Sequence, residues 1–205
     1  MKLLVTAGPT REKIDPIRFI SNLSSGRMGY AVAAAAAEAG HEVTLISGPT
    51  ALPVPPGVKI VNVISAAEMA QAVHAAAPQA DVIIMAAAVA DYRPAHPAEL
   101  KMKKGDGSIF LELERTEDIL ASLGKNRMPE QLLVGFAAET DHLKEHALDK
   151  LKRKNLDWIA ANSADESFGR ETNRVILFHR SGKSIPLPPG PKTEVARAML
   201  EVILS

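Results

Sequence analysis

Short apolar runs alternate with amphipathic stretches along most of the chain. Apolar runs of this length between turn signals are typical of strands buried on both faces. They occur at residues 3–7, 43–47, 58–63, 81–88, 132–138 and 157–162. Helical periodicity is found at residues 26–39, 66–77, 117–123 and 140–154. Strands interleaved with helices predict an α/β fold with a Rossmann-like, doubly wound and mostly parallel sheet.

Two segments interrupt this alternation. Residues 10–23 form a long, charged, proline-containing insertion after the first strand, and a loop of that length is usually functional or an interaction arm. Residues 174–187 (RVILFHRSGKSIPL) predict an antiparallel hairpin that turns at Ser181 and Gly182 and forms an appended flap. An amphipathic helix over residues 192–204 is expected to close a single domain spanning residues 1–205.

Composition narrows the possible classes of protein. The 24 Lys and Arg residues balance the 24 Asp and Glu residues, so no overall charge favours nucleic acid or an anionic membrane as a partner. The absence of cysteine excludes disulfides, thiolate zinc sites and cysteine nucleophiles. Because there is neither a signal-peptide pattern nor an apolar run near the roughly 20 residues of a membrane span, we expect a cytoplasmic protein.

The stretch ISNLSSGRMG, residues 20–29, follows the first strand and begins the first helix. Ser24 or Ser25 is predicted to cap this helix, and Gly26 and Gly29 would let the backbone approach a phosphate at the helix N-terminus. The alternative is a capped helix whose glycines serve only helix–strand packing. The second strand ends in Ser47 and Gly48, without the acidic residue that holds an NAD ribose, which weakens a dinucleotide interpretation.

Other charged residues are open to two interpretations. Asp91 follows the small-residue run 86–90 at the expected carboxyl edge of the sheet, where it could accept hydrogen bonds or help to hold a metal. Lys101, Lys103 and Lys104 could neutralise a triphosphate from a mobile loop, or form a solvated charge run. Lys150 and Lys154 share a helix face, where interaction with the helix dipole is the simpler explanation.

The pair His142 and His146 has helical spacing that could hold a metal, but the chain contains no H-E-x-x-H motif. A solvated helix face is therefore the favoured interpretation of these histidines, and apart from the suggestion for Asp91 the metal ligands stay unknown. Pattern and charge together predict a polyanion the size of a nucleotide at the carboxyl edge of the sheet, without naming the reaction.

Five stretches in order resemble a known family. They are GPTREKIDPIRFISNLSSGRMG, AAAVADYRP, KMKK, VGFAAET and KLKRKNLDWIAAN. Their residues and their order closely resemble those of bacterial phosphopantothenoylcysteine synthetases, the ligases of coenzyme A biosynthesis. The resemblance covers essentially the whole chain. It implies a Rossmann-like fold with a dimerisation flap, a homodimer, and an active site near the dimer interface.

The resemblance implies a two-step reaction. The carboxylate of 4′-phosphopantothenate would be activated by CTP with a divalent cation (Mg²⁺ or Mn²⁺), giving an acyl-cytidylate and pyrophosphate. Cysteine would then form the amide and release CMP. A flavin-dependent phosphopantothenoylcysteine decarboxylase commonly precedes this region in bacterial relatives. Since Met1 stands directly before the first strand, we expect either a separate synthetase or an excised domain.

The resemblance also assigns residues. Asn22 matches the essential asparagine, Arg18 the arginine near the acyl intermediate, and Lys101 the lid lysine over the triphosphate. Contacts with CTP would come from Ser24, Ser25, Gly26, Met28, Gly29, Ala90, Asp91, Glu117, Asp118, Ile119, Leu120, Phe136, Lys150 and Lys154. Two departures are Arg27, where many relatives carry lysine, and Glu117, which replaces a frequent proline or asparagine.

There are three alternatives to a CTP-dependent synthetase. A short-chain oxidoreductase would need Tyr-x-x-x-Lys, but Ala34 and His96 stand four residues after Tyr30 and Tyr92, the only tyrosines. A non-catalytic nucleotide sensor would be expected to lack Asn22 or Lys101, and both are present. The third alternative keeps the reaction and uses ATP, as eukaryotic relatives do, whereas the bacterial wording of the motifs favours CTP.

Overall fold

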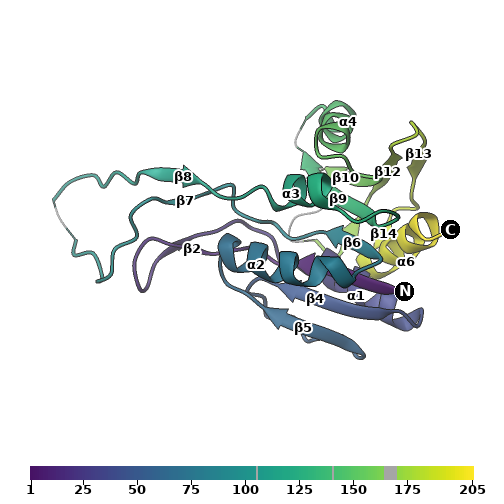
Figure 1. The fold of residues 1–205 in the computed structure, drawn as a ribbon. Helices are drawn as coiled ribbons and strands as arrows, with labels where there is room; N and C mark the ends of the chain where they lie inside the picture. Colours follow the sequence, from purple (N-terminus) through teal and green to yellow (C-terminus); the bar gives the residue numbers. More distant parts are fainter. Residues whose placement is uncertain (105, 140, 164–169) are drawn as a thin grey trace.

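The computed structural model describes residues 1–104, 106–139, 141–163 and 170–205. Within them, one sheet contains eight strands (Figure 1). Their spatial order is β13 (Ser184–Pro186), β12 (Ile176–His179), β10 (Trp158–Ser163), β9 (Leu132–Glu139), β6 (Val82–Met85), β1 (Lys2–Ala7), β4 (Glu42–Ser47) and β5 (Val58–Asn62). The strands from β10 to β5 pair in parallel, which confirms the predicted doubly wound sheet.

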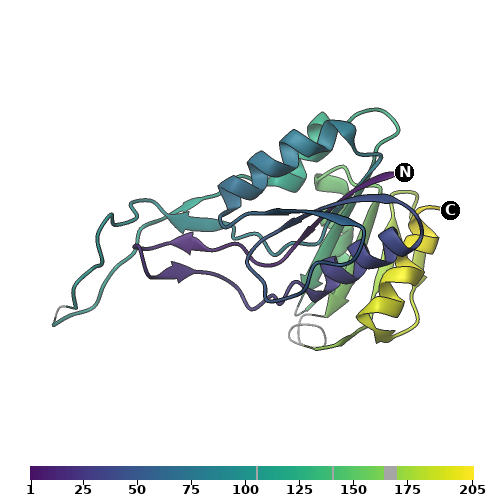
Figure 2. The same cartoon turned by 90° about the horizontal axis from the view of Figure 1, so that it is seen from below.

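Helices cover both faces of the sheet (Figures 1 and 2). On one face, α1 (Arg27–Glu38) and α6 (Lys192–Ile203) pack against Leu3, Val5 and their neighbours. The opposite face carries α2 (Ala66–Ala76), α3 (Ile119–Asn126) and α4 (Leu143–Arg153) over a core that includes Leu4. A short 3₁₀ helix, η1 (Ala77–Gln79), extends α2. Adjacent residues of β1 thus face different cores, which explains why buried parallel strands have continuous apolar sequences.

The helix and strand positions follow the apolar pattern, with small shifts at the ends. The strand expected over residues 81–88 ends at Met85, because the chain then turns out of the sheet. The helix expected over residues 117–123 runs from Ile119 to Asn126, and Asp118 caps it by accepting from the Ala121 N–H. Of the helix expected over residues 140–154, Thr140 lies outside the described residues, and α4 begins at Leu143.

The hairpin expected over residues 174–187 is present, but it continues the main sheet rather than standing apart from it. β12 pairs with β10 and β13 pairs with β12, both antiparallel. Gly182 turns the chain between them with a φ of 91°. Two further short strands, β11 (Thr172–Asn173) and β14 (Gly190–Pro191), pair beside the hairpin.

Two hairpins leave the carboxyl edge of the sheet and project from the body (Figure 1). The arm, residues 10–23, contains β2 (Glu12–Lys13) and β3 (Phe19–Ile20). The extension, residues 91–116, contains β7 (Tyr92–Pro94) and β8 (Leu113–Arg115) near its base. The arm matches the predicted insertion, whereas the sequence indicated only a loop for the extension.

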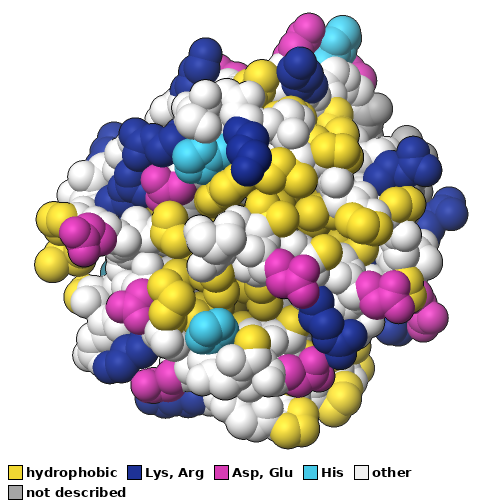
Figure 3. Space-filling view, turned by 90° about the vertical axis from the view of Figure 1, so that its right-hand side faces the viewer, with side chains coloured by type: hydrophobic (Ala, Val, Ile, Leu, Met, Phe, Trp, Pro, Cys, Tyr) yellow, Lys and Arg dark blue, Asp and Glu magenta, His cyan; other side chains and the backbone are white. Residues whose placement is uncertain are grey.

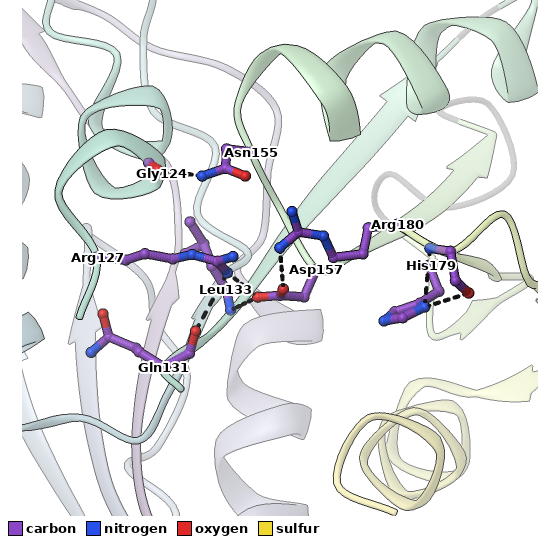
Figure 4. Close-up of polar contacts among 9 residues, drawn as sticks. Gly124, Arg127, Gln131, Leu133, Asn155, Asp157, His179 and Arg180 are labelled. Atoms are coloured by element: carbon purple, nitrogen blue, oxygen red, sulfur yellow. Dashed lines mark hydrogen bonds and ion pairs between the residues drawn. The ribbon is translucent and has the colours of Figure 1, made fainter. Parts of the chain in front are cut away.

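The amino edge of the sheet, at the opposite end, is held by a buried ion cluster (Figure 4). Arg127 and Arg180 approach the Asp157 carboxylate from either side, and the same carboxylate accepts from the Leu133 N–H at 2.9 Å. Seen from this end, apolar side chains gather in the middle of the face among charged ones (Figure 3). Among helices built from described residues, none is both long and apolar enough to cross a bilayer.

Candidate active site at the carboxyl edge

Two joined hollows lie at the carboxyl ends of β1 and β6, which are neighbouring strands of the sheet. In parallel α/β sheets this point, where the strand order reverses, is the usual place for ligands. The larger hollow, of about 260 Å³, lies at the start of α1, and the smaller, of about 120 Å³, lies at the start of α3. Asp91, Phe136 and Lys150 line both. The site can therefore hold one elongated ligand or two ligands end to end.

The larger hollow brings together the predicted loop residues. Ser24, Ser25, Gly26, Met28 and Gly29 all line it. Gly26 has a φ of 77°, which is the left-handed conformation that favours glycine. A Cβ on Gly26 would stand 2.8 Å from the Thr50 methyl group and 3.1 Å from Gly8 Cα. The backbone at this turn is therefore held by contact with two other loops.

The prediction that Ser24 or Ser25 caps α1 is wrong. The capping position is Gly26, and among the described residues no side chain caps the first turn of α1. The Ser24 hydroxyl instead accepts from the Gly26 N–H at 3.3 Å, because the left-handed turn puts both serines outside the helix. The partial positive charge of the helix N-terminus consequently faces the hollow without a side-chain cap.

Gly29 bears on the alternative that the glycines of this turn serve only helix–strand packing. A Cβ there would stand 2.6 Å from Ala7 Cβ and 2.7 Å from the Thr6 carbonyl oxygen. Gly29 therefore lets α1 lie close against β1, so that the helix N-terminus can reach the end of the strand. At this position packing and ligand access are served by the same residue.

The smaller hollow collects the other predicted nucleotide contacts. Its lining includes Ala90, Asp91, Glu117, Asp118, Ile119, Leu120, Phe136, Lys150 and Lys154. Lys154 donates to Asp118 at 2.8 Å. Burial raises the pKa of Asp118, but the hydrogen bonds from Lys154 and the Ala121 N–H outweigh it, so that this pKa lies below its ordinary value. The two helical lysines therefore do more than interact with the dipole of α4.

Lys150 is a partly buried cation at the junction of the hollows. Its Nζ donates to the Phe136 carbonyl oxygen at 2.8 Å. Burial, with a contribution from the charge of Lys154, lowers its pKa, while Glu139, Asp118 and Asp91 act in the opposite direction. No carboxylate among the described residues lies within ion-pair distance of it.

Asn22 lies beside the larger hollow and is held at both ends of its amide. Its Nδ2 donates to the Ala88 carbonyl oxygen at 2.7 Å, and its Oδ1 accepts from the Ser24 N–H at 3.0 Å. One hydrogen of the Nδ2 group remains for another acceptor. The side chain is exposed, so a ligand can reach it.

Arg18 and Lys101 are not brought to either hollow within this chain. Arg18 lies on the arm, where its Nε and Nη2 donate to Asp15. Lys101 is exposed on the extension, beside Met102, whose carbonyl oxygen accepts from Arg18 Nη2 at 3.0 Å. Arg18 therefore contacts the residue next to Lys101, and neither predicted residue lines a hollow with the other predicted contacts.

Sequence reasoning missed two residues of this region. Lys192, at the start of α6, lines the larger hollow, and burial followed by the charge of Arg27 lowers its pKa. Asp15 joins the arm to the extension. Lys192 lies outside the recognised motifs, and the motif that contains Asp15 gave no reason to single out this residue, so only the folded chain shows what the two contact.

The chain matches the family described as the DNA/pantothenate metabolism flavoprotein C-terminal domain over residues 1–205. It belongs to this family. Among curated relatives, the coenzyme A biosynthesis bifunctional protein CoaBC of Bacillus subtilis (strain 168) is 47% identical over 98% of this chain and 50% of its own length. CoaBC of Escherichia coli (strain K12) is 43% identical over 100% of this chain and 52% of its own.

A cysteine/cysteine sulfinic acid decarboxylase from an unknown prokaryotic organism is 47% identical, over 100% of this chain and 58% of its own length. The chain thus spans about half the length of the curated relatives it matches.

Solved structures agree with this membership. The crystal structure of the C-terminal domain of CoaBC superposes with a TM-score of 0.85 at 47% identity, covering 98% of this chain and 93% of that one. A Cab2 mutant in complex with phosphopantothenate-cysteine has a TM-score of 0.81 at 15% identity, covering 99% of this chain and 85% of that one. At that identity the likeness supports the fold alone.

Proposed function

We propose that this chain is a CTP-dependent phosphopantothenate–cysteine ligase of coenzyme A biosynthesis. The family membership, the relatives named for coenzyme A biosynthesis, and the ordered motifs all support this function. The Cab2 protein of the same fold is complexed with phosphopantothenate-cysteine, the product that this ligase would make. A flavin-dependent decarboxylase, on the same or another chain, is the proposed next partner for that product.

The observation that carries the proposal is the charge of Lys150. A cation that is partly buried and has no carboxylate partner costs free energy that an anionic ligand can offset. Lys150 lies where the two hollows join, with the uncapped N-terminus of α1 on one side and Lys154 on the other. A nucleotide triphosphate is a polyanion of suitable length for such a site.

In the proposed first step, a carboxylate oxygen of 4′-phosphopantothenate attacks the α-phosphorus of CTP. The bond to the β-phosphate breaks, and pyrophosphate leaves with its electron pair. In the second step the amino group of cysteine attacks the acyl carbon, the bond to CMP breaks, and the amine loses a proton. The protein contributes mainly orientation and charge neutralisation, as is usual for such transfers.

Asn22 is proposed to stabilise the acyl group. A neutral amide donor can bind the oxygen on which negative charge develops, without adding a competing charge. Its bonds to Ala88 and Ser24 hold the side chain in one orientation, and the second Nδ2 hydrogen is the proposed donor. Arg18 Nη1, which makes no hydrogen bond within the described residues, is the proposed contact for the pantothenate side.

A divalent cation, Mg²⁺ or Mn²⁺, is part of the proposed reaction. The described residues contain no group of three or more His, Cys, Asp or Glu side chains able to hold a metal. This fits a cation that is bound mainly by nucleotide phosphates, because Mg²⁺ commonly uses only one or two protein carboxylates. Asp91, which lines both hollows, would hold it, and the cation would supply charge neutralisation on the phosphates.

A second copy of the chain is the proposed partner of the arm and the extension. Large apolar side chains are exposed there: Ile17, Phe19 and Leu23 on the arm, and Leu100, Ile109, Phe110, Leu111 and Leu113 on the extension. Clustered exposed apolar groups of this kind mark interaction surfaces. Hairpin β12–β13, the flap of the sequence prediction, carries no such side chain among its described residues. The apolar surface therefore favours the arm and extension as the interface.

The deciding experiment measures pyrophosphate release from purified protein with 4′-phosphopantothenate and Mg²⁺, comparing CTP with ATP. Release that depends on phosphopantothenate, followed by mass-spectrometric detection of the cysteine conjugate and CMP once cysteine is added, is the expected result. Faster turnover with ATP would keep the ligase and replace the nucleotide. No release with either nucleotide would overturn the proposed function.

A further inference from the structure

Asp15, at the turn of the arm, has a carboxylate with no exposed surface. Its Oδ1 accepts from the backbone N–H groups of Ile17 and Arg18, at 2.9 and 2.8 Å. Its Oδ2 accepts from Arg18 Nε at 2.9 Å and also from Nη2. The hydrogen bond from the Arg18 side chain holds the pKa of Asp15 far below its usual range. The carboxylate therefore fixes both the turn and the direction of the guanidinium.

The same carboxylate also reaches the extension, 87 residues away in sequence. The Met102 N–H donates to Asp15 Oδ2 at 3.1 Å, and Arg18 Nη2 donates to the Met102 carbonyl oxygen at 3.0 Å. A third contact between the two hairpins runs from the Ala98 N–H to the Ile14 carbonyl oxygen at 2.9 Å. Both backbone groups of Met102 are thus bound by one ion pair on the arm.

Lys101 is the residue directly before Met102, so its backbone position follows from these contacts. We propose that Asp15 is a positioning residue for the ligase reaction, which latches the Lys101 segment of the extension to the Arg18 segment of the arm. This inference rests on the proposed function only for the role of Lys101 in activation. The latch itself is a property of the folded chain.

The chemistry requires a carboxylate at this position. Asp15 Oδ2 accepts from three N–H groups, two of the Arg18 guanidinium and one of the Met102 backbone. An asparagine amide could offer only one oxygen, and its NH₂ group would face donors on the other side. Asp15→Asn therefore keeps the shape of the side chain and removes part of the latch, leaving a buried donor without an acceptor.

Limited proteolysis tests the latch without any assay of activity. Trypsin cleaves after Lys101, Lys103 and Lys104 when the extension is free to enter the protease. Asp15→Asn should speed cleavage at these sites by about tenfold, the effect expected from losing a hydrogen bond to a charged group. The matched control is Asp106→Asn, the same change at an exposed residue of the extension, and it should leave the rate unchanged.

Met102→Pro tests the latch from the other side, in case Asp15→Asn does not fold. It removes the Met102 N–H donor without altering the buried carboxylate, and cleavage is then scored after Lys103 and Lys104. Faster cleavage is again expected. The two single variants, Asp15→Asn and Met102→Pro, are each compared with the unmutated protein. If both fold and both are cleaved at the rate of the unmutated protein, the latch is overturned.

A double-mutant cycle tests the positioning role. If Asp15 acts through Lys101, Asp15→Asn should slow pyrophosphate release by about tenfold alone, but by a clearly smaller factor in a Lys101→Gln background, where only the part that acts through Arg18 remains. Purely additive effects would mean that Asp15 does not act through Lys101. If the unmutated protein released no pyrophosphate, the proposed function would be lost, while the proteolysis result would still decide whether the latch exists.

Discussion

At the scale of single residues, Lys150 combines a cost in stability with its proposed role in binding. Burial lowers its pKa, so the charged form is disfavoured in the folded chain relative to the unfolded one. Between this lowered pKa and the usual value of about 10.5, the unfolded state holds the proton and the folded state does not. The free energy of unfolding therefore rises with pH through that window, and below it the protein carries the cost of a buried charge.

This leads to a prediction for nucleotide binding. Because a bound triphosphate favours the charged amine, binding should take up a proton when the pH lies between the lowered and the usual pKa of Lys150, and CTP affinity should fall as pH rises. Calorimetry in two buffers of different ionisation enthalpy measures this proton uptake. Lys150→Met should abolish the uptake and raise the melting temperature at neutral pH, whereas Lys152→Met, at an exposed position of α4, should do neither.

Asn22→Asp should cripple product formation while leaving CTP binding intact. The change removes the amide donor. It also places a carboxylate beside the Ala88 carbonyl oxygen, which in the unmutated protein accepts a hydrogen bond from the Asn22 amide. Loss of one donor to a developing oxyanion typically slows a reaction by about 10²–10³-fold, which steady-state turnover would show. Asn126→Asp, where the amide also donates to a backbone carbonyl, is the control. Near-normal turnover in Asn22→Asp would remove this residue from its proposed role.

At the scale of helices and strands, the two edges of the sheet have separate tasks. The carboxyl edge carries the hollows, whereas the Asp157 cluster at the amino edge joins β9, β10 and β12 (Figure 4). Trp158 also packs against His179, with ring centroids 4.5 Å apart. The cluster is part of the framework and lies away from the candidate site.

Asp157→Ala should consequently destabilise the fold without changing nucleotide affinity. Removing the carboxylate leaves the guanidinium of Arg127 partly buried without its partner, and such a loss typically costs about 3 to 5 kcal/mol. Chemical denaturation measures the free energy of unfolding, and a CTP titration of the folded variant measures affinity. If Asp157→Ala lowered CTP affinity as well as the free energy of unfolding, the two edges of the sheet would be energetically coupled.

The order of strands and helices could be predicted because each is marked by its own apolar pattern. The ends were less certain, since caps such as Asp118 and the left-handed Gly26 depend on how the chain enters a helix. The extension was missed for a physical reason. Its strands β7 and β8 are short and lie mostly outside the core, so they carry no buried alternation that a sequence pattern could reveal.

The candidate site shows the same division. Residues of recognisable motifs, such as Ser25 and Asp118, could be predicted to lie at the carboxyl edge, and they line the hollows there. The contact between Asp15 and Met102 could not, because it joins two hairpins through backbone groups, which any residue supplies. Sequence likewise did not indicate that Arg18 would bind the backbone beside Lys101, with neither residue lining a hollow.

At the scale of the whole molecule, the projecting arm and extension expose apolar surface that an isolated chain would leave in water. Leu23, Leu100 and Phe110 are 89%, 81% and 94% exposed. If a second copy covers them, both hairpins become part of an interface, and the Asp15 latch would then hold two parts of one docking surface in register.

Phe110→Asp should weaken this proposed self-association by at least about tenfold, because aromatic side chains often dominate interface energies and a buried charge is unfavourable there. Sedimentation equilibrium measures the change in dissociation constant. Val54→Asp, a similar change at an exposed apolar residue outside the two hairpins, is the control and should have no effect. A chain that is monomeric before mutation would rule out the second copy as the partner.

The glycine turn at the start of α1 has a consequence for drug resistance. Gly26 cannot accept a side chain without contact with Thr50 and Gly8, and Gly29 cannot without contact with Ala7 and Thr6. A compound that binds the peptide groups of this turn would therefore meet a surface that point mutation can hardly reshape while the fold survives.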